Sequence, residues 1–296
     1  MAGAISEQRS NIEHLMMSFD PLYVEARKIL LDALVALAPH GSAVIVVGAQ
    51  AVYLRSNELE LAIAPYTTDA DLALNPSLLG DDPELENAMG SAGFHLKPQP
   101  DGNIAPGMWL ATVEVDGQTH DVPVDLIVPE GATAGGGRRG ARLGVHGNRA
   151  ARRAVGLEAA LVDHSPMLIT ALDPTDRRSI EAEVAGPAAL FVAKAHKLND
   201  RIASEKTDRI DDKDAADVVR LMQSVSAAEV RETLKALVGD PVAGQPVRDG
   251  IVYLNDLFGR RGRPGIEMAA RAMRVAMDSA TVEVICTAYM AELDES

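Results

Sequence analysis

The pattern of hydrophobic residues changes near residue 187, and this change limits the folds open to the chain. Before it, short β-branched runs such as residues 43–47 alternate with amphipathic segments such as residues 21–38. After it, only helical spacing is found, in residues 187–203, 212–223, 226–238, 246–258 and 264–292. Mixed elements followed by helices alone predict an α/β or α+β domain and then a helical domain. We place these domains at residues 1–180 and 181–296.

The first part of the chain contains further strand and helix signals. Residues 108–115 and 120–128 have strand character and are joined through Asp116-Gly117, a strong signal for a two-residue hairpin. We expect other strands at residues 70–74 and 167–172, and helices at 49–55 and 83–92.

Charge and composition limit the environment and the partners. The formal net charge is −15, and one cysteine, Cys286, excludes an intramolecular disulfide and a site made of several cysteines. The apolar runs are too short to cross a bilayer, and residues 1–20 contain acids and no apolar core of a signal peptide. We therefore expect a soluble, cytoplasmic protein with no membrane partner.

One basic segment stands out against this acidic background. It contains six arginines and no acid: Arg138, Arg139, Arg142, Arg149, Arg152 and Arg153. Either it is a solvated loop, since glycines 135–137 lead into it, or it is a rim that attracts phosphate groups of an acceptor.

The stretch from Val44 to Leu74 carries the chemistry. Gly48 ends a predicted strand and begins a helix, so backbone N–H groups there can face an anion such as a triphosphate. Asp69 and Asp71 lie two residues apart, so their side chains point to one face of a strand. Two adjacent carboxylates repel each other unless a cation holds them, and Mg²⁺ accepts carboxylate and phosphate oxygens.

A third acid, Asp125, lies inside the apolar run at residues 122–129. An acid in a buried strand is costly unless it is paired or bound to a metal. The alternatives are a capping or turn role for Asp69 and Asp71, and a salt bridge at a strand end for Asp125.

These residues resemble the signature of the DNA polymerase beta-like nucleotidyltransferases: a strand, a Gly-Gly or Gly-Ser step, a helix, an Asp-x-Asp strand and a later acid. Residues 193–201 and 211–222 resemble the AbiEii-like branch, which includes toxins of toxin–antitoxin systems. The resemblance covers roughly residues 43–222. It implies an α+β nucleotidyltransferase fold, with a small mixed sheet and flanking helices, followed by a helical domain.

The resemblance also assigns roles to single residues. Asp69, Asp71 and Asp125 correspond to the metal-binding carboxylates. Gly48 and Ala49 correspond to the turn that contacts phosphate, although the family prefers Gly or Ser where this chain has Ala49. Lys194 corresponds to the lysine that reaches the nucleotide phosphates, with Lys197 in reserve, and Asp214 to the acid of the downstream helix. On residue type alone, Lys194 is a surface lysine and Asp214 an acid favoured by the helix dipole.

The resemblance implies an enzyme that uses Mg²⁺ or Mn²⁺ to transfer an NMP from an NTP to an acceptor such as the 3′ end of a tRNA. Growth inhibition and a cognate antitoxin partner follow from the same analogy. Two other hypotheses stay open. One is a catalytically silent binding protein with this fold, and the other is a nucleotidyltransferase that acts on a protein or on a small molecule such as an aminoglycoside.

Overall fold

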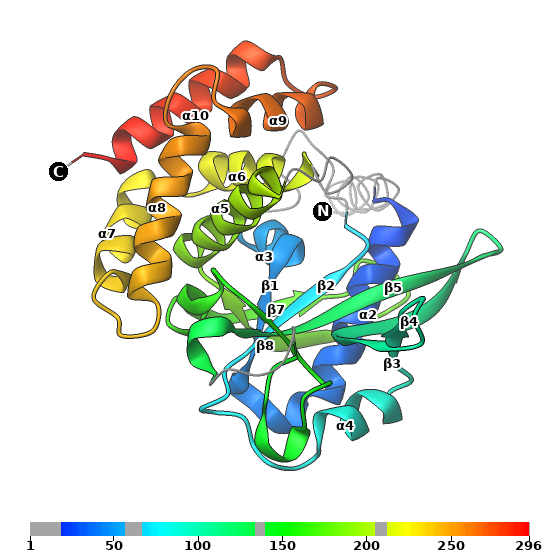
Figure 1. Cartoon of the computed structure of the whole chain (residues 1–296). Coiled ribbons are helices and arrows are strands. Elements are labelled where there is room, and N and C mark those ends of the chain that lie inside the picture. The colour runs from blue at the N-terminus through cyan, green and yellow to red at the C-terminus, as the bar shows by residue number, and fades with distance from the viewer. Residues whose placement is uncertain (1–18, 57–66, 134–139, 205–211, 296) are drawn as a thin grey trace, which may run out of the picture.

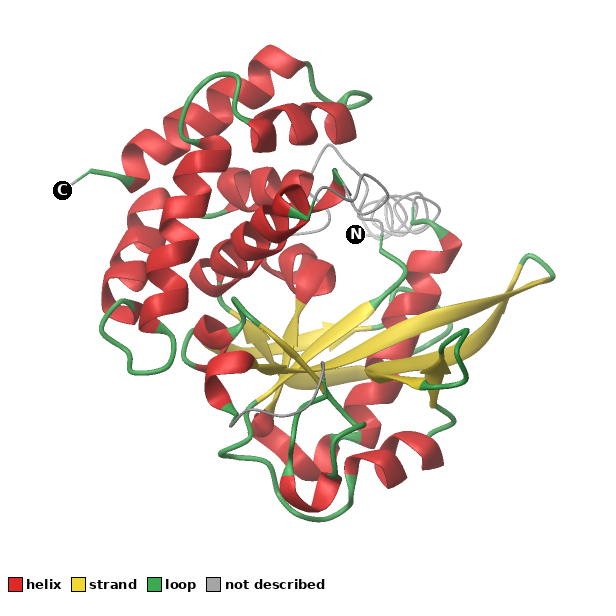
Figure 2. Cartoon of the chain, viewed as in Figure 1, coloured by secondary structure: helices red, strands yellow, loops and turns green. Residues whose placement is uncertain are grey.

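The computed structural model describes residues 19–56, 67–133, 140–204 and 212–295. Figure 1 shows a twisted mixed sheet with helices packed around it, and Figure 2 shows how the helices gather beyond one side of the sheet. The predicted α+β class is therefore confirmed. Within the described residues, no helix has the length and hydropathy needed to cross a bilayer.

In the part of the chain that the structure describes, eight strands form one sheet, which is larger than the small sheet that was expected. They are β1 (Val44–Val47), β2 (Ala70–Leu74), β3 (His95–Pro98), β4 (Ile104–Val115), β5 (Gln118–Pro129), β6 (Arg152–Ala154), β7 (His164–Thr170) and β8 (Ser179–Ala185). The order is β3-β4-β5-β2-β1-β8-β7, and β6 pairs with β5. Strand β1 is antiparallel to β2 and parallel to β8, and β2 is parallel to β5.

The hairpin between β4 and β5 forms as predicted. Asp116 and Gly117 both have positive φ, 52° and 74°, as a two-residue loop of this type requires. The paired strands continue beyond the predicted ranges, because β4 begins at Ile104 and β5 covers Gln118–Pro129. Met108 pairs with Asp125 within the sheet.

Among the described residues, three α-helices belong to the first part of the chain: α2 (Pro21–Ala36), α3 (Gly48–Arg55) and α4 (Leu85–Ser91). Six follow the last strand: α5 (Pro187–Ala203), α6 (Lys213–Ser224), α7 (Ala227–Leu237), α8 (Gly244–Phe258), α9 (Pro264–Met273) and α10 (Ser279–Leu293). The single helix predicted at 264–292 is wrong, because the chain breaks between α9 and α10. Asp278 accepts a hydrogen bond from the backbone N–H of Thr281 (2.9 Å) and starts α10 as an N-cap.

The helical part packs directly against the sheet part. Helix α3 contacts β1 and β2 on one side and α5 and α6 on the other, so it links the two parts. The predicted boundary at 180/181 falls inside β8, which pairs with β1 in the centre of the sheet. The sheet therefore extends to Ala185.

Candidate functional site

The predicted residues around Gly48 meet where β1 ends and β2 begins. Because β1 and β2 are antiparallel, Val47 pairs with Asp71, so the start of α3 lies beside this carboxylate. Asp71 is in turn the direct register partner of Asp125 across the parallel pair β2–β5. Partners in register point to the same face of a sheet, so two acids distant in sequence become neighbours.

Gly48 allows a close approach between α3 and Asp71. Its φ is +70°, and a Cβ added there would overlap the Oδ2 atom of Asp71 and lie 2.8 Å from its Cγ. Only glycine fits this position, for reasons of both conformation and space. Ala49, in contrast, is 6% exposed and belongs to the hydrophobic core, so its methyl group packs inward.

Asp125 is held by Arg152 of β6. The Nε and Nη2 atoms of Arg152 both donate to Oδ2 of Asp125, at 3.1 and 2.7 Å. The other oxygen, Oδ1, is buried and has no hydrogen-bond partner. A buried carboxylate oxygen without a partner is costly, and a bound cation would satisfy it.

Asp69 lies just before β2, outside the strand on which it was expected, and its carboxylate contacts other side chains. Its Oδ1 accepts a short hydrogen bond from the Thr67 hydroxyl, and Nζ of Lys213 lies 4.0 Å away. Across residues 19–56, 67–133, 140–204 and 212–295, no three His, Cys, Asp or Glu side chains are grouped to hold a metal ion. The three predicted carboxylates are therefore not gathered around one point, because Thr67 and Lys213 engage Asp69.

Burial and the charged side chains nearby change the pKa of Asp71. Burial, together with the negative charges of Asp69 and Asp125, raises its pKa from 3.8 to about 6, although Lys197 and Arg152 partly offset this effect. A carboxylate whose charge is disfavoured in this way gains most from a divalent cation. Asp71 and Asp125 thus fit such a cation, with Asp69 as the third ligand only if it turns away from Thr67.

Lys194 lines the cavity, but its ammonium group is engaged by two aspartates. Its Nζ donates to Asp214 (2.6 Å) and to Asp217 (2.7 Å), and all three side chains are buried. Burial lowers the lysine pKa, but the two aspartates outweigh this effect and hold it above its ordinary value. Lys197, one turn later on α5, is 45% exposed and contacts Asp214 at 3.2 Å. Lys197 is therefore the more available cation for a phosphate.

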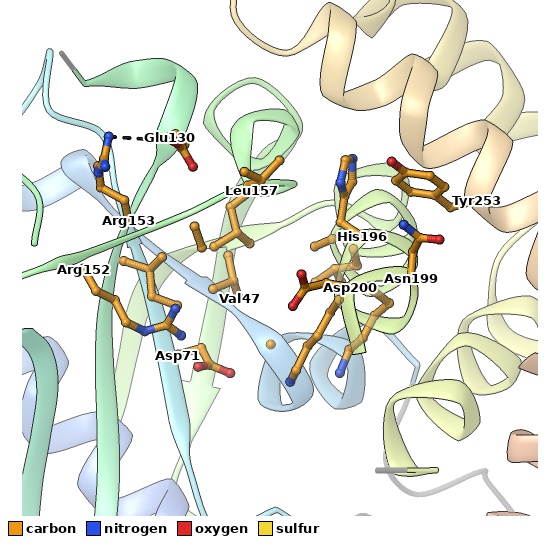
Figure 3. A pocket seen from close by; sticks show the side chains of 18 of the residues that line it. Val47, Asp71, Glu130, Arg152, Arg153, Leu157, His196, Asn199, Asp200 and Tyr253 are labelled. Carbon is orange, nitrogen blue, oxygen red and sulfur yellow. Dashed lines mark ion pairs between the residues drawn. The ribbon is translucent and has the colours of Figure 1, made fainter. Parts of the chain in front are cut away.

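A cavity of about 610 Å³ lies between the carboxylates and α5. Gly48, Asp71 and Arg152 line its sheet side. In Figure 3 the opposite wall carries four side chains of α5 and α8 that the sequence did not single out: His196, Asn199, Asp200 and Tyr253. Of these, Asp200 was recognisable by its spacing, three residues after Lys197 on one helix face.

The arginine segment is not a continuous unpaired rim. Arg149 forms an ion pair with Glu86, Arg152 with Asp125, and Arg153 with Glu130 at 3.8 Å. Arg142 is exposed, whereas Arg138 and Arg139 lie outside the described residues. Arg152 and Arg153 line the cavity, so this part of the segment faces the site. The sequence segment lacks acids, but the fold supplies them from α4, from β5 and from the turn that follows β5.

Comparison with known proteins adds no identification. No protein-family model matches the chain, and no curated protein matches it.

Proposed function

We propose that this protein is a metal-dependent nucleotidyltransferase that transfers an NMP from an NTP to a hydroxyl group of an acceptor. The observation that carries this proposal is the pairing of Asp71 with Asp125 in register, with Gly48 packed against Asp71 at the start of α3. The resembled nucleotidyltransferase fold contains, in this order, a strand, a glycine, a helix, an antiparallel strand with the Asp-x-Asp pattern and a parallel strand that carries an acid. We propose this fold for the chain.

The residues on the cavity wall have complementary roles. Asp71 and Asp125 hold a divalent cation, Mg²⁺ or Mn²⁺. When bound, this cation supplies positive charge that offsets the charge of the triphosphate. The N-terminus of α3 at Gly48 presents backbone N–H groups to the phosphates, and Lys197 adds a side-chain charge. Lys194 instead fixes α6 against α5 through Asp214.

The group transfer itself needs a proton acceptor and a leaving group. The acceptor oxygen forms a bond to the α-phosphorus while the bond to the departing pyrophosphate breaks. The proton of the acceptor hydroxyl passes to the oxygen of the Asp125 carboxylate that the cation does not occupy. Pyrophosphate carries away the electron pair of the broken bond.

The acceptor that we propose is an RNA with a free 3′ hydroxyl. Arg153, which lines the cavity, supports an anionic acceptor, whereas the net charge of −15 opposes it. An antitoxin partner rests on the resemblance alone.

A second candidate is a silent nucleotide-binding protein of the same fold. One observation favours it: Asp69 is engaged by Thr67 and lies 4.0 Å from Lys213, so a complete set of three carboxylates is not preformed.

Release of pyrophosphate separates the two candidates. We expect Mg²⁺-dependent release from one or more NTPs with RNA present, and loss of release in Asp125→Asn. Asp121→Asn is the matched control, because Asp121 is exposed on the same strand and bonds only to Thr112 among the described residues. NTP binding without pyrophosphate release in the wild type supports the silent binding protein.

A further inference from the structure

One oxygen of a proposed metal ligand is already occupied by a cation of the chain itself. Arg152 places two N–H groups on Oδ2 of Asp125 and leaves Oδ1 bare. Nothing in the proposed function requires this ion pair. A guanidinium beside Asp125 repels any divalent cation that binds the same carboxylate.

The backbone of Arg152 is fixed independently of this ion pair. Arg152 pairs with Ile127 in the parallel ladder of β5 and β6. Gly107 of β4, with φ +72°, leaves room for it, because a Cβ there would overlap the backbone N of Arg152 and lie 2.6 Å from the Leu126 carbonyl oxygen. The backbone N–H of Gly107 also donates to the carbonyl of Arg149 (2.8 Å). The side chain can therefore change partner while its strand stays in place.

The guanidinium of Arg152 can also turn into the cavity. The side chain of Arg152 is 29% exposed and lines the cavity, and Figure 3 shows it directed along the sheet wall toward Asp71. A triphosphate in this cavity carries more negative charge than one carboxylate and offers a planar guanidinium two acceptor oxygens.

We propose that Arg152 is a nucleotide-binding residue that pairs with Asp125 before the nucleotide binds and moves to the triphosphate when the nucleotide binds. This inference rests on the proposed function and concerns its regulation. The transfer frees Asp125 for the divalent cation, so nucleotide and cation bind cooperatively through one side chain. The ion pair also limits binding of the cation when no nucleotide is present.

The test measures two affinities of the full-length protein that are expected to change in opposite directions. Binding of Mn²⁺ alone is followed by electron paramagnetic resonance of the free ion. Binding of inorganic triphosphate is followed by calorimetry in EDTA. For Arg152→Gln we expect Mn²⁺ to bind about tenfold more tightly and triphosphate about tenfold more weakly than to the wild type. Arg152→Lys, which keeps the charge, is expected to restore both affinities in large part.

Arg149→Gln is the matched control, since Arg149 lies on the same segment but pairs with Glu86 of α4. It is expected to change neither affinity.

A second pair of variants tests the inference at the carboxylates and does not depend on the folding of Arg152→Gln. Asp125→Asn releases Arg152, so triphosphate is expected to bind more tightly to it than to Asp71→Asn, which removes the same charge without releasing the guanidinium.

The outcomes separate this inference from the proposed function. Weaker Mn²⁺ binding by Arg152→Gln, unchanged triphosphate binding by it, or equal triphosphate binding by the two aspartate variants would each overturn the role of Arg152. A wild type that binds neither Mn²⁺ nor triphosphate would contradict the proposed function itself.

Discussion

Replacing Asp71 by Asn is expected to stabilise the metal-free protein at pH 8 while abolishing transfer. The pKa of Asp71 is raised from 3.8 to about 6 by burial and by the neighbouring charges of Asp69 and Asp125. A raised pKa in the folded state means that stability is fully present below pH 3.8 and is lost as the pH rises through about 6. Each pH unit corresponds to about 1.4 kcal/mol, so the shift costs up to about 3 kcal/mol at pH 8.

Urea unfolding in EDTA measures this cost. Trp109 is the only tryptophan of the chain and is 3% exposed, so its fluorescence reports unfolding. We expect Asp71→Asn to raise the free energy of unfolding by up to about 3 kcal/mol at pH 8 and by roughly half as much at pH 5. With excess Mg²⁺ in place of EDTA, the wild type is expected to be stabilised modestly at pH 8, because the Arg152–Asp125 ion pair opposes the cation, and Asp71→Asn is expected not to be stabilised.

Asp121→Asn is the control for a general effect of charge, and it is expected to show no such dependence on pH. If Asp71→Asn raises the free energy of unfolding equally at pH 5 and pH 8, or lowers it at pH 8, this result would refute the reasoning that three carboxylates repel one another here.

The remaining predictions concern the neighbours of this carboxylate. Gly48→Ala is expected to lower the free energy of unfolding by about 2 kcal/mol or more, because Gly48 has a positive φ and an added Cβ would overlap Asp71. Urea unfolding measures this change, and an unchanged free energy of unfolding would contradict the close packing. Lys194→Met is expected to destabilise the fold by at most about 3–5 kcal/mol, since it removes the buried cation that Asp214 and Asp217 share while Arg201 and Lys197 still contact Asp214. Lys197→Gln is expected to change the free energy of unfolding by less than about 0.5 kcal/mol and to weaken NTP binding in calorimetry. If Lys194→Met weakens NTP binding and Lys197→Gln does not, Lys194 is the cation that binds the phosphates.

The local part of the site was predictable from the sequence because it depends on near neighbours. The β-branched run before Gly48 and the two-residue spacing of Asp69 and Asp71 are short-range signals. The structure confirms the strand, the helix that follows it and the second strand. The hairpin at Asp116-Gly117 then fixes how β5 returns, and this return brings Asp125 beside Asp71.

The partners of the charged side chains were not predictable in the same way. Arg152 and Asp125 are 27 residues apart, and Lys194 reaches Asp217 across 23 residues, so each pair depends on how whole elements pack. The sequence shows six arginines without an acid, but it does not show that α4 and β5 bring Glu86 and Asp125 to them. Strand β8 was missed because its Glu and Ala residues have low strand propensity and only two of its seven positions are buried.

Transfer of label from an NTP tests the central claim most directly. The protein is incubated with each α-labelled NTP, Mg²⁺ and total RNA, beside Asp71→Asn and the control Asp121→Asn. The account predicts label on RNA with the wild type and with Asp121→Asn, and none with Asp71→Asn. Label on the protein or on an added aminoglycoside, in place of RNA, would show that this molecule and not RNA is the acceptor. No label on any acceptor, with a folded wild-type protein that binds the NTP, would contradict the proposal that this site transfers nucleotides.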